Sequence, residues 1–211
     1  MFDDLKNALI AGNASAVKEM VTTLLKSGTP AQTILKDALI AGMDQIGDRF
    51  RKNEVFIPEV MIAAKAMHSG LDVLQPVLAE SGIKPSAKVV VGTIKGDLHD
   101  IGKNIVSMMF RGAGFAVCDL GIDVPPQKFI NSIRSEKANV LAMSSLLTTS
   151  MTFMKDVMDL LKSEGLDAQV KTIVGGAPVT QEFADKIGAD GYAEDASSAV
   201  NKVRELLGSG V

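Results

Sequence analysis

A change of rhythm near residue 85 constrains the fold of this chain more than any other feature of its sequence. Beyond it, short apolar runs rich in β-branched residues alternate with stretches in which apolar residues recur every three or four positions. The runs predict strands at 89–94, 115–120, 140–144, 171–174 and 191–193. Helices are expected to begin near residues 102, 125, 149, 180 and 195. Strands that are apolar on both faces and alternate with helices predict a parallel sheet covered on both sides.

The residues before this change predict helices only. One apolar stripe at helical spacing consists of Met61, Ala64, Met67, Leu71, Leu74 and Leu78. Helix punctuation is present as well, with Gly28 as a stop, Thr29 as an N-cap, Pro30 at a first helical position and Pro58 starting the last helix. The pentapeptide "ALIAG" occurs at 8–12 and again at 38–42, which suggests two similar helix ends.

The fold class expected from these patterns is α/β in two domains. Residues 1–84 are predicted to form a four-helix bundle, which would act as a cap domain. Residues 85–211 are predicted to form a doubly wound, five-stranded parallel sheet of the Rossmann or flavodoxin type. The linker "SGIKPSAK" joins the two, and we expect a hinge around residues 82–87.

Composition excludes several classes of function. The 211 residues carry a formal charge of −3 with no basic stripe, so no nucleic acid is expected as a partner. No stretch approaches the roughly 20 apolar residues of a spanning helix, and early acids replace the positive charge of a secretory signal. We therefore expect a cytoplasmic protein without a membrane partner. The one cysteine, Cys118, fits a buried strand thiol, with a reactive thiol as the alternative.

Three unusual segments follow predicted strands, where open α/β sheets bind their ligands. They are "KGDLHDIG" at 95–102, "SSLLTTS" at 144–150 and "GGAP" at 175–178. Each has a purely structural alternative, namely a loop histidine, a helix cap at Thr148 or Thr149, and a tight turn. A zinc site lacks further ligands at a recognisable spacing, because Cys118 and His68 are poor candidates and His68 fits a partly exposed helix position.

These residues resemble the cobalamin-binding domain of corrinoid-dependent methyltransferases. The family pattern Asp-x-His-x-x-Gly, Ser-x-Leu and Gly-Gly appears as Asp97 to Gly102, Ser144 to Leu146 and Gly175-Gly176, with spacings that fit. The first half resembles the helical cap that precedes this domain, through "GDRFRKNEVFIPEVMIAAKAM" at 47–67. Together these resemblances cover essentially the whole chain and are closest to the small corrinoid proteins of methanogens and acetogens.

The resemblance implies a cofactor and its contacts. The cofactor is cobalamin or a related corrinoid in the methyl or aquo form, with His99 replacing its own lower base as the cobalt ligand (base-off, His-on). Asp97 and Ser150 match a relay that hydrogen-bonds the histidine, while Ser144 and Thr148 match positions that line a slot for the nucleotide tail. The other matching cofactor-binding positions are Gly96, Leu98, Asp100, Ile101, Gly102, Leu146, Gly175 and Gly176.

The cap has a separate implied role, which is to cover the upper face of the corrinoid with apolar side chains. Phe50 and Ile57 match these covering positions, although leucine is usual at the second. The alternative is that both residues are ordinary bundle core. The cap would have to move aside for the cobalt to reach a substrate.

The function that the resemblance implies is a methyl carrier, a corrinoid subunit that is not a catalyst by itself. Its Co(I) state would accept a methyl group from a substrate-specific methyltransferase and give it to a second methyltransferase, whose acceptor is tetrahydrofolate or coenzyme M. A reductive activase is a further expected partner. The alternatives are a cobalamin-dependent sensor, which the lack of tryptophan disfavours, and a mutase subunit, which normally lacks this cap.

Overall fold

The fold consists of a helical unit followed by an α/β unit. The structure is a computed structural model that describes residues 1–81, 85 and 87–208. It divides into one compact unit of Met1–Ser86 with Arg111–Gly114, and a second of Ala87–Phe110 with Phe115–Val211. The predicted hinge falls largely on residues 82–84 and 86, which lie outside the described residues. Within the described part of the chain, no helix is long and apolar enough to cross a membrane.

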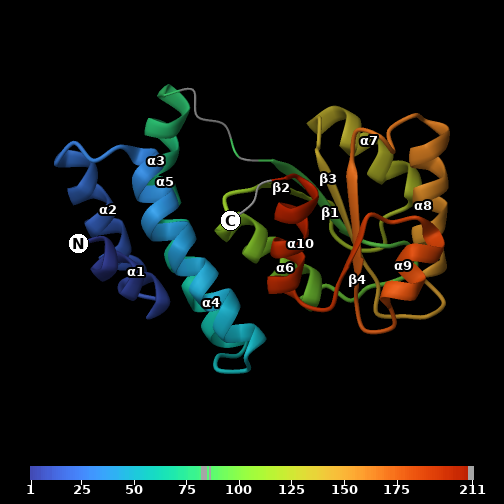
Figure 1. The fold of residues 1–211 in the computed structure, drawn as a ribbon, viewed down its shortest axis with the longest axis horizontal. Coiled ribbons are helices and arrows are strands. Elements are labelled where there is room, and N and C mark those ends of the chain that lie inside the picture. The colour runs from blue at the N-terminus through green and yellow to red at the C-terminus, as the bar shows by residue number, and fades with distance from the viewer. Residues whose placement is uncertain (82–84, 86, 209–211) are drawn as a thin grey trace. The chain divides into compact units, whose positions relative to one another are not determined.

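The helical unit is built from four successive helical segments (Figure 1). Their bounds are α1 Phe2–Ile10, α2 Ala14–Lys26, a third segment made of α3 Ala31–Ile34, η1 Leu35–Ile40 and α4 Ala41–Arg51, and α5 Ile57–Glu80. The third segment includes one π-helical stretch, η1. Asn13 caps α2 by accepting a hydrogen bond from the N–H of Ala16 at 3.1 Å. The predicted four-helix bundle is confirmed.

The two copies of "ALIAG" have different structures. In the first copy, Gly12 takes the left-handed conformation (φ +72°) and ends α1. The second copy lies inside the third helical segment, so the second predicted helix end is wrong. A Cβ atom at Gly42 would lie 3.2 Å from a methyl carbon of Leu9, so glycine there allows α1 and α4 to pack closely. One pentapeptide thus serves a turn in one place and helix packing in the other.

Two further local predictions in this unit need correction. Pro30, not Thr29, is the N-cap of α3, so that helix begins one residue later than expected. Met61 is 49% exposed and does not belong to the buried face of α5, whereas Met67, Leu74 and Leu78 do. The buried face instead begins with Val60 and Ala63, each one position earlier than the predicted Met61 and Ala64.

The α/β unit contains the five predicted strands in parallel. They are β1 Lys88–Thr93, β2 Ala116–Asp119, β3 Val140–Ser144, β4 Lys171–Gly175 and β5 Gly191–Ala193. The strand order is β2-β1-β3-β4-β5, and all neighbours pair in parallel. In this order the chain passes from β1 to β2 towards one edge of the sheet and from β3 to β5 towards the other edge. The strand order therefore reverses between β1 and β3, which is where doubly wound sheets bind ligands. The predicted fold class is confirmed.

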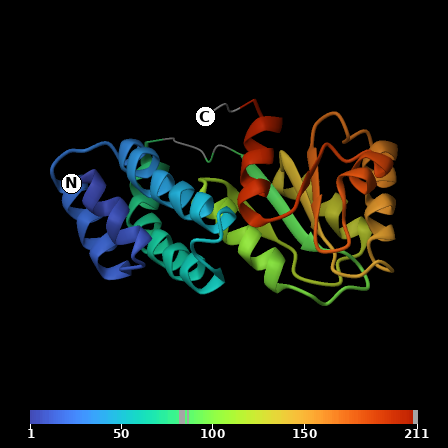
Figure 2. The same cartoon turned by 60° about the horizontal axis from the view of Figure 1, so that its bottom comes forward.

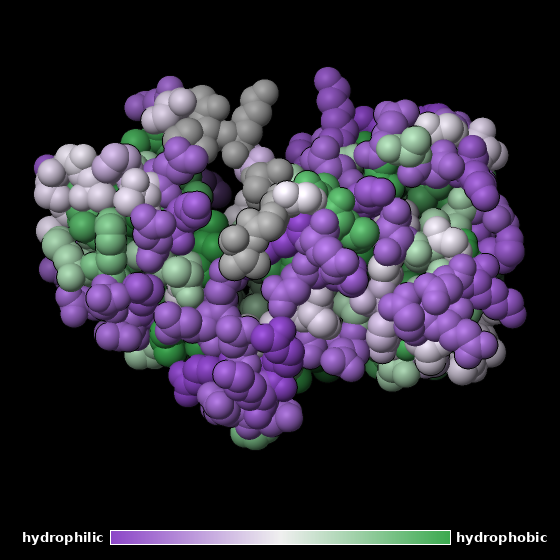
Figure 3. All heavy atoms as spheres, viewed as in Figure 1, coloured by the Kyte–Doolittle hydropathy of each residue, from purple (hydrophilic) through white to green (hydrophobic). Residues whose placement is uncertain are grey.

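Helices cover both faces of this sheet. Their bounds are α6 Ile101–Gly112, α7 Pro126–Glu136, α8 Thr152–Ser163, α9 Gln181–Ile187 and α10 Ala196–Leu206. Figures 1 and 2 show α6 and α10 on one face and α7, α8 and α9 on the other. Figure 3 shows that polar residues cover most of the viewed face of the unit.

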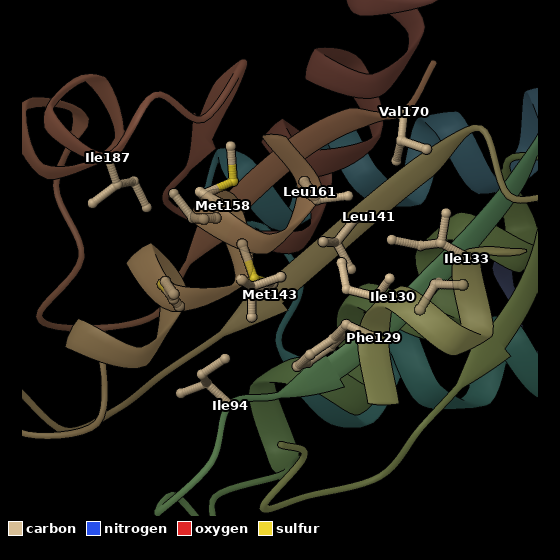
Figure 4. Packing of buried hydrophobic residues seen from close by; sticks show 14 of the residues in the cluster. Ile94, Phe129, Ile130, Ile133, Leu141, Met143, Met158, Leu161, Val170 and Ile187 are labelled. Atoms are coloured by element: carbon tan, nitrogen blue, oxygen red, sulfur yellow. The ribbon is translucent and has the colours of Figure 1, made fainter. Parts of the chain in front are cut away.

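A continuous apolar core lies between the sheet and α7 to α9 (Figure 4). Phe129 and Ile130 of α7 pack with Leu141 and Met143 of β3, and all four are nearly or completely buried. Strand residues face this core on one side and the α6 and α10 layer on the other, which is why the strands are apolar throughout. This packing holds the carboxyl ends of the strands in place, and the candidate site lies in the loops that follow those ends.

Candidate functional site

The loop after β1 is the centre of the candidate site. Residues 94–100 leave the sheet through a turn in which the N–H of Asp97 donates to the carbonyl of Ile94 at 3.2 Å. Gly96 takes a left-handed φ of +81° in that turn. Its N–H donates to Asp123 Oδ1 at 2.7 Å, and the N–H of Asp123 donates back to the Asp97 carbonyl at 3.0 Å. These reciprocal bonds tie the loop after β1 to the loop after β2.

Asp97 holds the imidazole of His99 in a defined orientation. The Asp97 side chain is completely buried, whereas the His99 side chain is 52% exposed. Asp97 Oδ1 lies 2.7 Å from His99 Nδ1 and accepts the backbone N–H of His99 at 3.0 Å. Thr93 adds a bond from its hydroxyl to the His99 carbonyl at 2.9 Å. In the neutral imidazole whose Nδ1 donates to the carboxylate, Nε2 carries the free lone pair, as in metal-ligating histidines.

The second oxygen of Asp97 reaches the loop after β3. Asp97 Oδ2 accepts the N–H of Leu146 at 2.6 Å, the hydroxyl of Ser145 at 3.2 Å and the hydroxyl of Ser150 at 3.3 Å. The two hydroxyl oxygens lie 2.8 Å from each other. The structure therefore brings together the predicted relay residues Asp97, His99 and Ser150.

Ser145 and the Leu146 N–H are partners of Asp97 that the sequence analysis missed. Ser144 is the last residue of β3 and Ser145 is the first residue after it, and in the described part of the chain only the Ser145 hydroxyl of the two contacts Asp97. The sequence contains both hydroxyls but does not say which one faces the carboxylate. The family pattern, which begins at Ser144, gives no role to Ser145.

The charge state of Asp97 follows from its donors. Burial opposes ionisation and alone would raise its pKa, but the hydrogen bonds from the His99 and Leu146 N–H groups, the His99 ring and Ser145 outweigh it. The pKa therefore falls from its ordinary 3.8 to about 2. Asp97 is an anion at neutral pH, and its charge is stabilised by donors from two loops.

Exposed apolar side chains lie on the segment that carries His99 and on the loops after β2 and β3. Leu98 is 68% exposed and Ile101 is 69% exposed, on either side of His99 in the chain. Ile122 from the loop after β2, and Leu146 and Leu147 from the loop after β3, are exposed as well. Scattered exposed apolar residues need no explanation, but five on the loops after β1, β2 and β3 and at the start of α6 indicate a surface made to be covered.

The glycines of the site fall into two kinds. A Cβ atom at Gly176 would lie 1.8 Å from the Ser145 carbonyl oxygen, and one at Gly175 would lie 2.7 Å from the Ala193 carbonyl oxygen. These two glycines are therefore needed by the protein backbone itself, before any ligand is considered. Outside its own helix backbone and its chain neighbours, a Cβ atom at Gly102 would meet no atom of the described residues within 4 Å, so packing does not require glycine there.

The remaining predicted residues occupy different surroundings. Asp100 precedes α6 and binds Asn104 through both its side chain and its carbonyl. Ser144 is half-buried at the end of β3, and Thr148 is exposed. Thr148 and Thr149 do not cap α8, because that helix begins only at Thr152.

Phe50 and Ile57 belong to the helical unit rather than to the α/β unit. Phe50 is half-buried in α4, and Ile57 is exposed at the start of α5. Their role above a corrinoid stays a prediction.

Other reactive side chains do not add to the site. Cys118 is half-buried in β2, where burial raises the pKa of its thiol and the charge of Glu136 raises it further. This environment disfavours a reactive thiolate. His68 is exposed on α5 near Asp72, as expected. Among the described residues, no group of three or more His, Cys, Asp or Glu side chains is placed to hold a metal ion.

Comparison with known proteins relates this geometry to a family. Residues 87–201 match a protein family described as a B12 binding domain, and residues 1–75 match a second family with the same description. Dimethylamine corrinoid protein 3 of Methanosarcina acetivorans is 44% identical over 207 residues, which cover 98% of this chain and 97% of that protein.

Two solved structures are similar over almost the whole chain. A cobalamin-binding protein from Desulfitobacterium hafniense gives a TM-score of 0.81 at 32% identity and covers 97% of this chain and 98% of that one. The methanol:cobalamin methyltransferase complex MtaBC from Methanosarcina barkeri gives a TM-score of 0.85 at 30% identity, covering 98% of this chain and 79% of that one.

The lowered pKa of Asp97 predicts an acid-sensitive contribution to stability. Because its pKa is lower in the folded than in the unfolded chain, Asp97 stabilises the fold above pH 3.8 and loses this effect as pH falls towards about 2. We expect Asp97→Asn to lower the free energy of unfolding by ~2 kcal/mol at pH 7 and by about half as much at pH 3. Urea unfolding of the ligand-free protein at both pH values measures this.

Asp156→Asn, on the exposed side of α8, is the matched control for the loss of one negative charge. An equal effect of Asp97→Asn at pH 7 and pH 3 would contradict the assignment of an ionised, hydrogen-bonded carboxylate.

Proposed function

The chain belongs to the family of B12-binding corrinoid proteins, and we propose that it is a methyl carrier in which His99 ligates the cobalt of a bound corrinoid. When bound, the corrinoid supplies a cobalt ion that can hold a methyl group. The protein would carry that group from a substrate-specific methyltransferase to a second methyltransferase. The observation that carries the proposal is the buried carboxylate of Asp97, which fixes an exposed imidazole with Nε2 free.

The residues present fit such a cofactor. A metal held by protein side chains alone needs several ligands, and the described residues offer no such cluster. One imidazole nitrogen is sufficient when a macrocycle supplies the other ligands of the cobalt. This arrangement supports the base-off, His-on form, in which Nε2 of His99 takes the place of the cofactor's own lower base.

The surroundings of His99 would bind and shield the macrocycle. Leu98 and Ile101 present apolar surface beside the imidazole, and burying them under a flat ring would remove them from water. Gly102 leaves the start of α6 without a side chain at a place where the protein has room for one. Ser144 and Thr148 are the proposed hydrogen-bond partners of the nucleotide tail.

Asp97 would also control the proton on His99. While Nε2 is a ligand, Nδ1 keeps its proton and donates it to Asp97 Oδ1. The buried carboxylate would thereby keep the proton on Nδ1 and leave Nε2 available to the cobalt.

The proposed methyl donor is a methylamine-class substrate bound to its own methyltransferase, because the relative named above is a dimethylamine corrinoid protein. The acceptor methyltransferase would use tetrahydrofolate or coenzyme M. We also propose a reductive activase as a partner, a cytoplasmic location, and no nucleic-acid or membrane partner.

The carrier function is tested by an anaerobic absorption spectrum. We expect the protein reconstituted with hydroxocobalamin to bind it, to be reduced, and to show the spectrum of methylcobalamin after a methylamine and its methyltransferase are added. Adenosylcobalamin, offered in parallel, is the control for a sensor or a mutase. Failure to bind either form, or methylation of free but not of protein-bound cobalamin, would contradict the proposal.

The ligand assignment is tested with His99→Ala. We expect electron paramagnetic resonance of the Co(II) state to show splitting by one nitrogen in the unmodified protein, and the splitting to change when the protein is made with ¹⁵N-histidine. In His99→Ala the splitting is lost and corrinoid affinity falls by about tenfold or more. His68→Ala removes the other, exposed histidine and leaves the spectrum unchanged. A spectrum insensitive to histidine labelling would overturn the assignment.

Gly102 allows binding to be separated from folding. Because a Cβ atom at this position would meet no described atom within 4 Å outside the backbone of its own helix and its two chain neighbours, we expect Gly102→Leu to fold with unchanged or slightly raised stability. The added side chain would occupy space proposed for the corrinoid, so affinity for hydroxocobalamin falls by about tenfold or more, equal to a loss of about 1.4 kcal/mol. Titration followed by absorbance measures this, with Gly102→Ala as the smaller variant. Unchanged affinity of the leucine variant would place the corrinoid elsewhere.

A further inference from the structure

Two buried hydroxyl groups compete for the same oxygen of Asp97. Ser145 Oγ lies 3.2 Å from Asp97 Oδ2 and Ser150 Oγ lies 3.3 Å from it. Both hydroxyls also lie 3.1 Å from the Leu147 carbonyl oxygen. The two side chains thus see the same pair of acceptors at nearly the same distances.

The proton count leaves two equivalent arrangements. Each hydroxyl has one proton to donate, and the 2.8 Å contact between Ser145 Oγ and Ser150 Oγ uses one of the two. The hydroxyl that accepts at this contact still has its own proton, which it donates to Asp97 Oδ2 or to the Leu147 carbonyl. Since the contact can run in either direction, either serine can be the donor to Asp97.

The position of Ser145 is fixed from a third strand end. The N–H of Ser145 donates to the Gly175 carbonyl at 3.1 Å, and the backbone of Ser145 fills the space where a side chain at Gly176 would lie. The glycine pair at the end of β4 therefore holds the Ser145 backbone in place, and with it the hydroxyl. This second observation is independent of the bonds to Asp97.

On the basis of the proposed function, we propose that Ser145 is a second positioning residue for His99, and that Ser145 and Ser150 are an interchangeable pair of hydroxyl donors to Asp97. The resemblance to the family gives this role to Ser150 alone. A donor to Oδ2 withdraws electron density from the carboxylate, which weakens its pull on the Nδ1 proton of His99. Through this proton the pair sets the basicity of Nε2 towards cobalt.

The proposal is tested by a double-mutant cycle in the full-length protein loaded with cobalamin. The readout is the Co(II)/Co(I) midpoint potential, together with nitrogen splitting in the Co(II) spectrum. We expect Ser145→Ala and Ser150→Ala each to stay close to the unmodified protein, because one hydroxyl remains. The double variant is expected to shift to a more negative potential by more than the sum of the single shifts, because a more basic imidazole stabilises the oxidised metal.

Two further variants separate positioning from a merely structural effect. Ser145→Thr combined with Ser150→Ala keeps one hydroxyl and is expected to restore the potential. Ser107→Ala removes a buried hydroxyl of α6 for which the described structure shows no hydrogen-bond partner, and it should leave the potential unchanged. If the double alanine variant does not fold, Ser145→Cys combined with Ser150→Ala takes its place in the cycle, because a thiol is a weaker hydrogen-bond donor than a hydroxyl, and it is expected to shift the potential in the same direction.

The proposal is overturned if Ser150→Ala alone shifts the potential as far as the double variant, or if the double variant behaves like the unmodified protein. These outcomes differ from failure of the proposed function, in which the unmodified protein itself shows no splitting from histidine nitrogen.

Discussion

The buried carboxylate of Asp97 is the interaction on which the site depends. Burying a carboxylate completely costs free energy of folding unless hydrogen-bond donors replace the lost water. Both oxygens of Asp97 therefore need donors from the protein. They come from its own loop through His99 and from the loop after β3 through Leu146, Ser145 and Ser150. Two loops distant in sequence are thereby fixed by one charge. The orientation of His99 is set by the protein before any cofactor binds.

The fold brings these groups together because β1 and β3 are neighbours although they are not consecutive. Thr93 pairs with Ser144 in the sheet, so the loop containing Asp97 and the loop containing Ser145 leave adjacent strand ends. The strand that leads into the loop after β2 is held by an ion pair, in which the buried side chain of Lys103 in α6 contacts the partly exposed Asp119 at the end of β2 at 2.5 Å. The order of the strands in the sheet, rather than proximity in the sequence, therefore brings Asp97, Ser145 and Ser150 together.

Sequence patterns predicted all five strands of the sheet. They predicted only some of the contacts around Asp97, because Ser145 and the Leu146 N–H were missed. The strands could be predicted because both faces of a buried parallel strand are apolar, and that signal is local. The helix expected to begin near residue 149 begins only at Thr152 as α8, because residues 148–151 form turns and neither Thr148 nor Thr149 caps it. Ser145 was missed because its partner, Asp97, lies 48 positions away in the chain. Contacts of this kind depend on register, which no local pattern encodes.

Some residues of the site are required by the fold itself, whereas three residues of the segment 98–102 are not. Gly176 is required by the neighbouring backbone, and Asp97 by the hydrogen bonds that it accepts. By contrast, Leu98 and Ile101 are largely exposed and Gly102 faces open space, so none of these three has a reason in the packing of the α/β unit. Exposed apolar side chains beside a bare backbone suit a large, flat, partly apolar group lying against the imidazole. Leu98, Ile101 and Gly102, which have no packing role, are thus the residues that point to the kind of ligand.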